Sequence, residues 1–114
     1  MAQLSARDGV LHLELSRWER VFALHGDIRV PLERVAAVAV SSDPFGELRG
    51  LRAPGTGVPR RIALGTWRRR GATDFAALYG GRPGVIVQLR DSAFARLLVS
   101  ADDAEGVAAR ITAP

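Results

Sequence analysis

The sequence predicts a mainly β domain of about seven short strands with one or two helices. Three observations lead to this fold class: segments in which apolar and polar residues alternate, turn residues between those segments, and one helical spacing pattern near the carboxyl end. At 114 residues, with 47% hydrophobic and 25% charged residues, the chain has the size and composition of a single folded domain.

The first predicted elements are a strand and a short helix. Residues 10–15 alternate between apolar and polar side chains, which is the pattern of a half-buried strand. Ser16 and Glu19 then have the spacing of a capping box, which favours a helix over residues 17–24 that ends at Gly26. The alternative is a β-hairpin that turns around Gly26.

Two strands and a long loop are expected next. Residues 28–31 can form a short strand, in which Pro31 favours an edge position. Residues 35–41 are rich in valine, which predicts a further strand. The segment from Phe45 to Pro59 has four glycines and two prolines without periodicity, so we expect a long loop that is functional or mobile.

The second half is predicted to contain strands followed by a helix. The strands are expected at residues 61–68, 74–79, 85–90 and 94–99. In the first of them, Trp67 lies on the face opposite Ile62 and Leu64. Ser100 is expected to cap the last helix, with Asp103 at its third position. The apolar stripe of that helix consists of Ala104, Val107, Ala108 and Ile111.

Basic residues are concentrated in one block between Leu48 and Thr73. The block has seven arginines and no acidic residue: Arg49, Arg52, Arg60, Arg61, Arg68, Arg69 and Arg70. The rest of the chain has nine arginines against twelve acidic residues, so the net charge of +4 comes from the block. Such clustering indicates an anionic partner or surface. The alternative is a solvated loop and turn in a chain that uses arginine in place of lysine throughout.

The carboxyl-terminal pattern, Phe94-Ala-Arg-Leu-Leu-Val-Ser100 followed by Ala-Asp-Asp, resembles the bacterial pleckstrin-homology-like (PH-like) domains. Leu32-Glu-Arg-Val-Ala-Ala-Val is similar to the start of a strand in that family. Arg49-Gly-Leu-Arg-Ala-Pro-Gly-Thr56 and Leu64-Gly-Thr66 are similar to a pattern of its uncharacterised actinobacterial members. The resemblance covers about residues 10–112. We expect the whole chain, residues 1–114, to form one domain. It implies a PH-like barrel of about seven antiparallel strands closed by a C-terminal helix, and a non-catalytic module that binds lipids, peptides or proteins.

The block and the resemblance together predict peripheral attachment to an anionic membrane surface. The seven arginines are the candidate ligand-binding residues, and each charge near an anionic leaflet contributes about 1 kcal/mol. Trp67, beside Arg68, is a candidate interfacial anchor. The alternative is a protein-interaction or self-assembling, homo-oligomeric module that uses exposed strand edges or the Trp18 and Phe22 pair. Nucleic acid is disfavoured as a partner, because only one aromatic residue lies in the block.

No catalytic, metal or cofactor site is predicted, so the chain is expected not to be an enzyme. It has no cysteine, and His12 and Glu14, which share a strand face, lack further ligands at a suitable spacing. A nucleophile elbow and a phosphate-binding glycine loop are both missing from the sequence. The longest apolar run has six residues and the amino terminus has no secretory pattern. A cytoplasmic location is therefore expected, with membrane contact peripheral and at the inner face.

Overall fold

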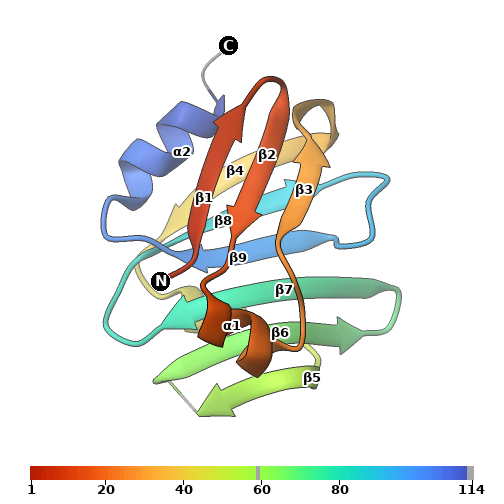
Figure 1. Ribbon diagram of the computed structural model, residues 1–114, viewed down its shortest axis with the longest axis vertical. Coiled ribbons are helices and arrows are strands. Elements are labelled where there is room, and N and C mark those ends of the chain that lie inside the picture. The colour runs from red at the N-terminus through yellow and green to blue at the C-terminus, as the bar shows by residue number, and fades with distance from the viewer. Residues whose placement is uncertain (59, 113–114) are drawn as a thin grey trace.

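The computed structural model describes residues 1–58 and 60–112, and in residues 51–54 it describes the backbone only. In this part of the chain nine strands form two sheets, and two α-helices lie toward opposite ends of the molecule (Figure 1). The helices are α1 (Arg17–Ala23) and α2 (Ala104–Thr112). The strands are β1 (Gln3–Arg7), β2 (Val10–Glu14), β3 (Ile28–Pro31), β4 (Val35–Ser41), β5 (Leu51–Val58), β6 (Ile62–Arg69), β7 (Ala72–Tyr79), β8 (Gly84–Leu89) and β9 (Arg96–Ser100).

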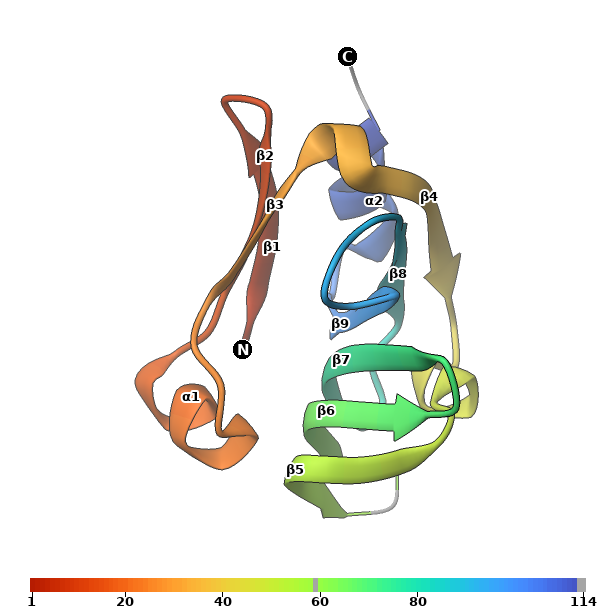
Figure 2. The same ribbon diagram turned by 90° about the vertical axis from the view of Figure 1, so that its right-hand side faces the viewer.

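The two sheets face each other across the main core (Figure 2). The smaller sheet has the antiparallel order β1-β2-β3, and the larger sheet has the order β4-β8-β9-β7-β6-β5. In the larger sheet β7 and β9 are parallel, while the other neighbours are antiparallel. The core between the sheets contains alternate side chains of both, among them Leu4, Leu11, Leu13, Val30, Leu64, Phe75, Val87 and Leu97. Burial of each such side chain contributes about 1.5–3 kcal/mol.

The larger sheet is covered on its outer face as well. β4 and β5 lie at its opposite edges, so the segment of residues 42–50 between them passes over that face. Phe45 and Leu48 of this crossing segment pack on a second apolar cluster of Ala63, Trp67, Ala76, Leu78, Ile86 and Leu98. The central strands of the larger sheet are therefore buried on both faces, which explains why their sequences are almost continuously apolar.

The capping box predicted at Ser16 is formed, and the helix is present rather than the hairpin. The Glu19 amide donates to the Ser16 hydroxyl at 3.4 Å, and the Ser16 amide donates to the Glu19 carboxylate at 2.8 Å. The helix ends one residue earlier than predicted, and its left-handed cap is Leu24, with a φ of 53°, instead of Gly26. The N–H of Leu24 donates to the carbonyl of Val21, which closes the last turn.

The predicted loop from Phe45 to Pro59 is wrong for much of its length. Residues 44–47 form a 3-10 turn, η2 (Pro44–Glu47), and residues 51–58 form β5; Pro59 lies outside the described residues. Two glycines explain the difference. A Cβ on Gly50 would lie 2.3 Å from the carbonyl oxygen of Arg68 in β6. A Cβ on Gly55 would lie 2.2 Å from the carbonyl oxygen of Leu64, which is also in β6. Their positive φ angles and lack of a side chain allow the irregular β5 backbone to approach β6 closely.

Three predictions about the sheets differ from the structure. β1, at residues 3–7, was assigned no element from the sequence, and the described residues form nine strands instead of about seven. The strands are not all antiparallel, because β9 lies between β7 and β8 and runs parallel to β7. The two sheets are not joined into a closed barrel by strand pairing. These features depend on pairing between distant segments, which local patterns do not reveal.

The C-terminal helix is confirmed as α2, but its predicted cap is wrong. Ser100 belongs to the end of β9, where its hydroxyl accepts a hydrogen bond from the Tyr79 amide at 2.8 Å. Asp103 precedes the helix, and its carboxylate accepts from the amide of Gly106 at 3.1 Å. The predicted stripe faces the core, with Ala104 and Ile111 buried and the other two residues partly buried.

We expect Gly50→Ala to lower the free energy of unfolding by about 2 kcal/mol, because the new Cβ would collide with the β6 backbone at a positive φ. Gly26→Ala is the matched control, since nothing lies within 4 Å of its Cβ position, and its effect should stay within about 0.5 kcal/mol. Denaturant unfolding of both variants measures the difference. Equal effects would contradict the close approach of β5 and β6.

Candidate functional site

The arginine block maps to β5, β6 and the adjoining turns, but it forms two groups and not one patch. Arg60 and Arg61 lie in the turn from β5 to β6. Arg68, Arg69 and Arg70 lie at the other end of β6. Because β6 has eight residues, the two groups are separated by roughly 20 Å at the usual rise per residue.

The two remaining arginines of the block lie near the second group. Arg49 precedes β5, and the backbone of Arg52 in β5 is the register partner of Trp67 in β6. The side chain of Arg52 lies outside the described part of the structure. The structure therefore brings five of the seven predicted residues to one end of the β5–β6 hairpin and the other two to its opposite end.

Arg49 and Arg60 of the block form ion pairs with described residues. Arg60 Nη1 lies 2.6 Å from the carboxylate of Asp43, but both side chains are more than half exposed, so the pair contributes little to stability. Arg49 Nε lies 3.0 Å from the carboxylate of Asp74, which is buried. The exposed side chains of Arg61, Arg69 and Arg70 form no ion pair with any described residue, and Arg68 is exposed as well.

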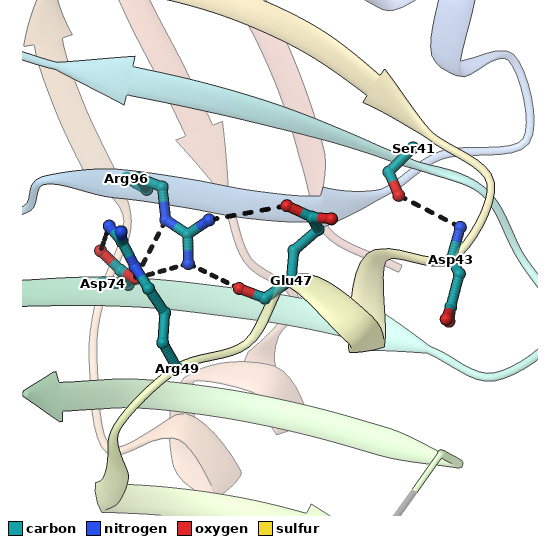
Figure 3. Close-up of polar contacts among 6 residues, drawn as sticks. All are labelled: Ser41, Asp43, Glu47, Arg49, Asp74 and Arg96. Atoms are coloured by element: carbon teal, nitrogen blue, oxygen red, sulfur yellow. Dashed lines mark hydrogen bonds and ion pairs between the residues drawn. The ribbon is translucent and has the colours of Figure 1, made fainter.

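The Asp74 carboxylate is the centre of an ion network on the outer face of the larger sheet (Figure 3). Its Oδ2 accepts hydrogen bonds from Arg96 Nε at 3.1 Å and from Arg96 Nη2 at 2.8 Å. Arg96 Nη2 also donates to the carbonyl oxygen of Glu47 at 2.6 Å. With the contact from Arg49, the network joins β7 and β9 to the crossing segment.

The network fixes the charge state of its buried carboxyl group. Burial alone would raise the pKa of Asp74. Hydrogen bonds from Arg49 and Arg96, together with the positive charges of both guanidinium groups, outweigh burial and hold that pKa below its ordinary value. The carboxylate is therefore ionised at neutral pH and occupied by its partners, which is the arrangement of a structural group and not of a general base.

Trp67 belongs to the outer-face cluster. Its side chain lies on the face of β6 opposite Ile62 and Leu64, as the alternation predicted. It is only 8% exposed, because the crossing segment covers it with Phe45 and Leu48. An interfacial anchor needs an exposed ring, so in this arrangement Trp67 packs the sheet instead of extending the basic surface.

A small apolar pocket lies beside Trp67, between η2 and the β5–β6 hairpin. Its volume is about 280 Å³, and its walls include Phe45, Leu48 and Ala63. Arg60, which pairs with Asp43, is the charged residue in its described lining. The pocket has no set of convergent polar groups like those that orient a substrate.

Glu19 attaches α1 to the larger sheet. Its carboxylate is fully buried, accepts from the Tyr79 hydroxyl of β7, and accepts from the Ser16 amide. Burial alone would raise the pKa of Glu19, but these hydrogen bonds outweigh burial and lower it. Burial, the hydrogen bond to Glu19 and the negative charge of Glu19 together raise the pKa of Tyr79. The acidic side of α1 is therefore directed into the protein.

The exposed side of α1 includes the Trp18 and Phe22 pair, which the sequence offered as an alternative interaction surface, and it extends to two further apolar residues. Trp18, Val21, Phe22 and the cap residue Leu24 are 43%, 63%, 50% and 67% exposed. Trp18 and Phe22 contact each other edge to face at 6.0 Å, as their spacing predicted. Apolar residues at this spacing usually indicate a core-facing side, and only the position of Glu19 reveals that they face outward here.

Neither histidine belongs to a metal site in the described residues. In residues 1–58 and 60–112, no group of three or more His, Asp or Glu side chains is placed to bind a metal ion. The ring of His25 packs against Phe75 at 5.2 Å and Phe94 at 5.5 Å, and its Nδ1 lies 2.8 Å from the carbonyl oxygen of Gly26. Among the described helices, none has the length and apolarity needed to cross a membrane.

Comparison with known proteins gives no relative. No family model matches the chain, and neither a curated protein nor a solved structure matches it. The functional proposals below therefore depend on the chain's own residues and geometry.

We expect Asp74→Asn to lower the free energy of unfolding by about 3 kcal/mol, because it removes the buried carboxylate partner of Arg96 and leaves this buried charge with the half-exposed Glu47 carboxylate, 4.0 Å away. Asp102→Asn is the control: its ion pair with Arg82 is exposed, so the loss should be below about 1 kcal/mol. Denaturant unfolding at neutral pH measures both values.

The wild-type protein and the Asp74→Asn variant together test how the free energy of unfolding depends on pH. Because folding lowers the pKa of Asp74, its stabilising effect is complete above the ordinary value of 3.8 and is lost as the pH falls through the folded value. The wild-type protein should therefore lose more stability than Asp74→Asn between about pH 4 and pH 2. Parallel stability profiles for the two proteins would contradict a lowered pKa.

Proposed function

We propose that the protein is a non-catalytic binding module that attaches peripherally to an anionic membrane surface through its β5–β6 end. The observation that carries the proposal is that β5, β6 and their adjoining turns, which contain the arginine block, lie together at one end of the molecule, the lower end in Figures 1 and 2. The exposed members whose side chains are described are Arg60, Arg61, Arg68, Arg69 and Arg70.

The division of the block into two groups is compatible with a flat anionic surface. A membrane offers many headgroups and needs no single binding pocket, so arginines at both ends of the hairpin contribute separately. Each charge near the leaflet is worth about 1 kcal/mol, and its effect extends over a Debye length of about 8–10 Å. The inner face of the cytoplasmic membrane is the surface that we propose, since that leaflet is the anionic one.

Membership in the PH-like class is part of this proposal. Two facing β-sheets and a C-terminal helix support it. The parallel pairing of β7 with β9 departs from the antiparallel barrel that the resemblance implies. The binding role is therefore argued from the arginines and not from the fold.

Association with a protein, including a second copy of the chain, is the second candidate function. It is favoured by β5, an edge strand of eight residues whose outer edge pairs with no described strand, and by the apolar side of α1 next to it. This association would bury apolar surface and would tolerate salt, whereas attachment through arginines weakens as salt rises.

The triple substitution of Arg68, Arg69 and Arg70 by glutamate tests the proposed function. We expect the wild-type protein to co-sediment with anionic vesicles, but not with neutral ones, at low salt. The triple variant should bind at least roughly a hundredfold more weakly, because three charges near the leaflet change sign and the local charge falls by about six units.

The matched control reverses three exposed arginines on other elements: Arg7 in β1, Arg29 in β3 and Arg110 in α2. It has the same net charge as the test variant and should retain clearly more vesicle binding. Equal losses in both variants would mean that net charge alone, and not the β5–β6 end, governs the attraction. A wild-type protein that does not bind anionic vesicles at low salt would overturn the proposed function.

A further inference from the structure

We propose that α1 is a membrane-inserting element, whose exposed apolar side chains enter the interfacial region of an anionic bilayer. This inference rests on the proposed function and names the part of the protein that adds apolar contact to the electrostatic attraction. It assigns a role to a surface outside the arginine block. The argument for it comes from exposure, charge and the place of the helix in the fold.

The apolar surface lies on α1, beside the neighbouring strand β5. Trp18, Val21 and Phe22 have the i, i+3, i+4 spacing that makes them neighbours on one side of the helix, and each is at least 43% exposed. The hydroxyl of Thr56 in β5 donates to the carbonyl of Phe22 at 2.8 Å. Val58, two residues farther along β5, is 46% exposed and also lines the pocket beside Trp67.

The charges around this surface select an anionic partner. Arg17 and Arg20 are exposed, while Glu19, the single acidic residue of the helix, is fully buried. The exposed side chains of α1 are therefore only apolar or cationic. One acidic group lies nearby, because Asp27, with 26% of its side chain exposed, pairs with Arg20 at 3.0 Å. Cationic residues beside exposed aromatic and aliphatic ones are typical of helices that lie in an anionic membrane interface.

Charge also argues against a second copy of the chain on this surface. Arg61 directly precedes Ile62, the register partner of Tyr79, whose ring contacts Trp18 at 6.0 Å. A symmetric contact through α1 would therefore bring the arginines of both copies toward each other. A bilayer with anionic headgroups provides the complementary charge and an apolar interior at the same place.

The position of α1 allows both contacts at once. In Figures 1 and 2 the helix lies at the same lower end of the molecule as β5 and β6, which carry the arginine block. The helix is already formed and is held by the capping box and by the hydrogen bond between Tyr79 and Glu19. Insertion therefore needs no folding of the element, and its apolar side chains are presented in a fixed orientation.

Quenching of tryptophan fluorescence by brominated lipid tests insertion directly. The probe is vesicles of phosphatidylcholine and phosphatidylglycerol with bromine on the acyl chains, and the protein is the full chain. We expect quenching on binding, because Trp18 enters the interface. Trp18→Phe should abolish the quenching while binding persists, and Trp67→Phe should retain it, since Trp67 is buried in the sheet.

A second variant tests the energetic contribution of the surface. We expect the double variant Val21→Ser with Phe22→Ser to bind anionic vesicles about tenfold more weakly at near-physiological salt, where the electrostatic part is screened. Both side chains are at least half exposed, so the fold should persist, and circular dichroism checks this. Val40→Ser is the matched control, because Val40 is a 40% exposed valine on β4, at the opposite edge of the larger sheet.

The outcomes separate this inference from the proposed function. Quenching of Trp18 and weaker binding of the double variant would support insertion. Salt-sensitive binding of the wild-type protein without quenching, and with an unchanged double variant, would overturn insertion and leave the proposed function intact. No binding at low salt would overturn both. A lipid-free dimer in sedimentation that the double variant loses would also overturn insertion, because a second copy would then cover α1.

Discussion

The outer half of this fold depends on one buried ion pair, between Asp74 of β7 and Arg96 of β9. The two side chains come from parallel neighbouring strands, and the same guanidinium group holds the backbone of the crossing segment at Glu47. That segment has to pass over the whole outer face to reach the position of β5. Arg49 of the same segment donates to Asp74, so both members of the pair tie the crossing segment to the outer face. β6 is placed by its pairing with β7, and the crossing segment leads the chain to β5 at the free edge of β6.

Arginine therefore has two physical roles in the chain. Arg96 and Arg49 neutralise a buried carboxylate, and their pairing is part of the packed structure. The arginines in the turns at either end of β6 are exposed, and their charge acts on the surroundings. The sequence does not separate these roles, because Arg49 belongs to the same acid-free block as the exposed residues. Contact with Asp74, 25 residues away along the chain, distinguishes them.

The helix α1 illustrates how one hydrogen bond sets the function of a surface. Its capping box was predictable from Ser16 and Glu19, since the interaction is local. Its orientation was not, because an apolar stripe normally faces the core. The Tyr79 hydroxyl, from a strand 60 residues away, draws Glu19 inward. The aromatic and aliphatic side chains are consequently left outside, beside cations, where they form the surface that we propose to enter a membrane.

The sequence by itself determined what depends on neighbouring residues: most strands, both helices, the faces of β6 and the concentration of positive charge. It misassigned β5, where Gly50 and Gly55 have the pattern of a loop but serve the close approach of two backbones. It assigned no element to β1, and it placed the cap of the last helix at Ser100, which bonds to Tyr79 instead. Only the tertiary structure decided the strand order, the burial of Trp67, the separation of the arginines into two groups and the outward side of α1. Each of these results from contacts between segments far apart in the chain, whose energies no local pattern contains.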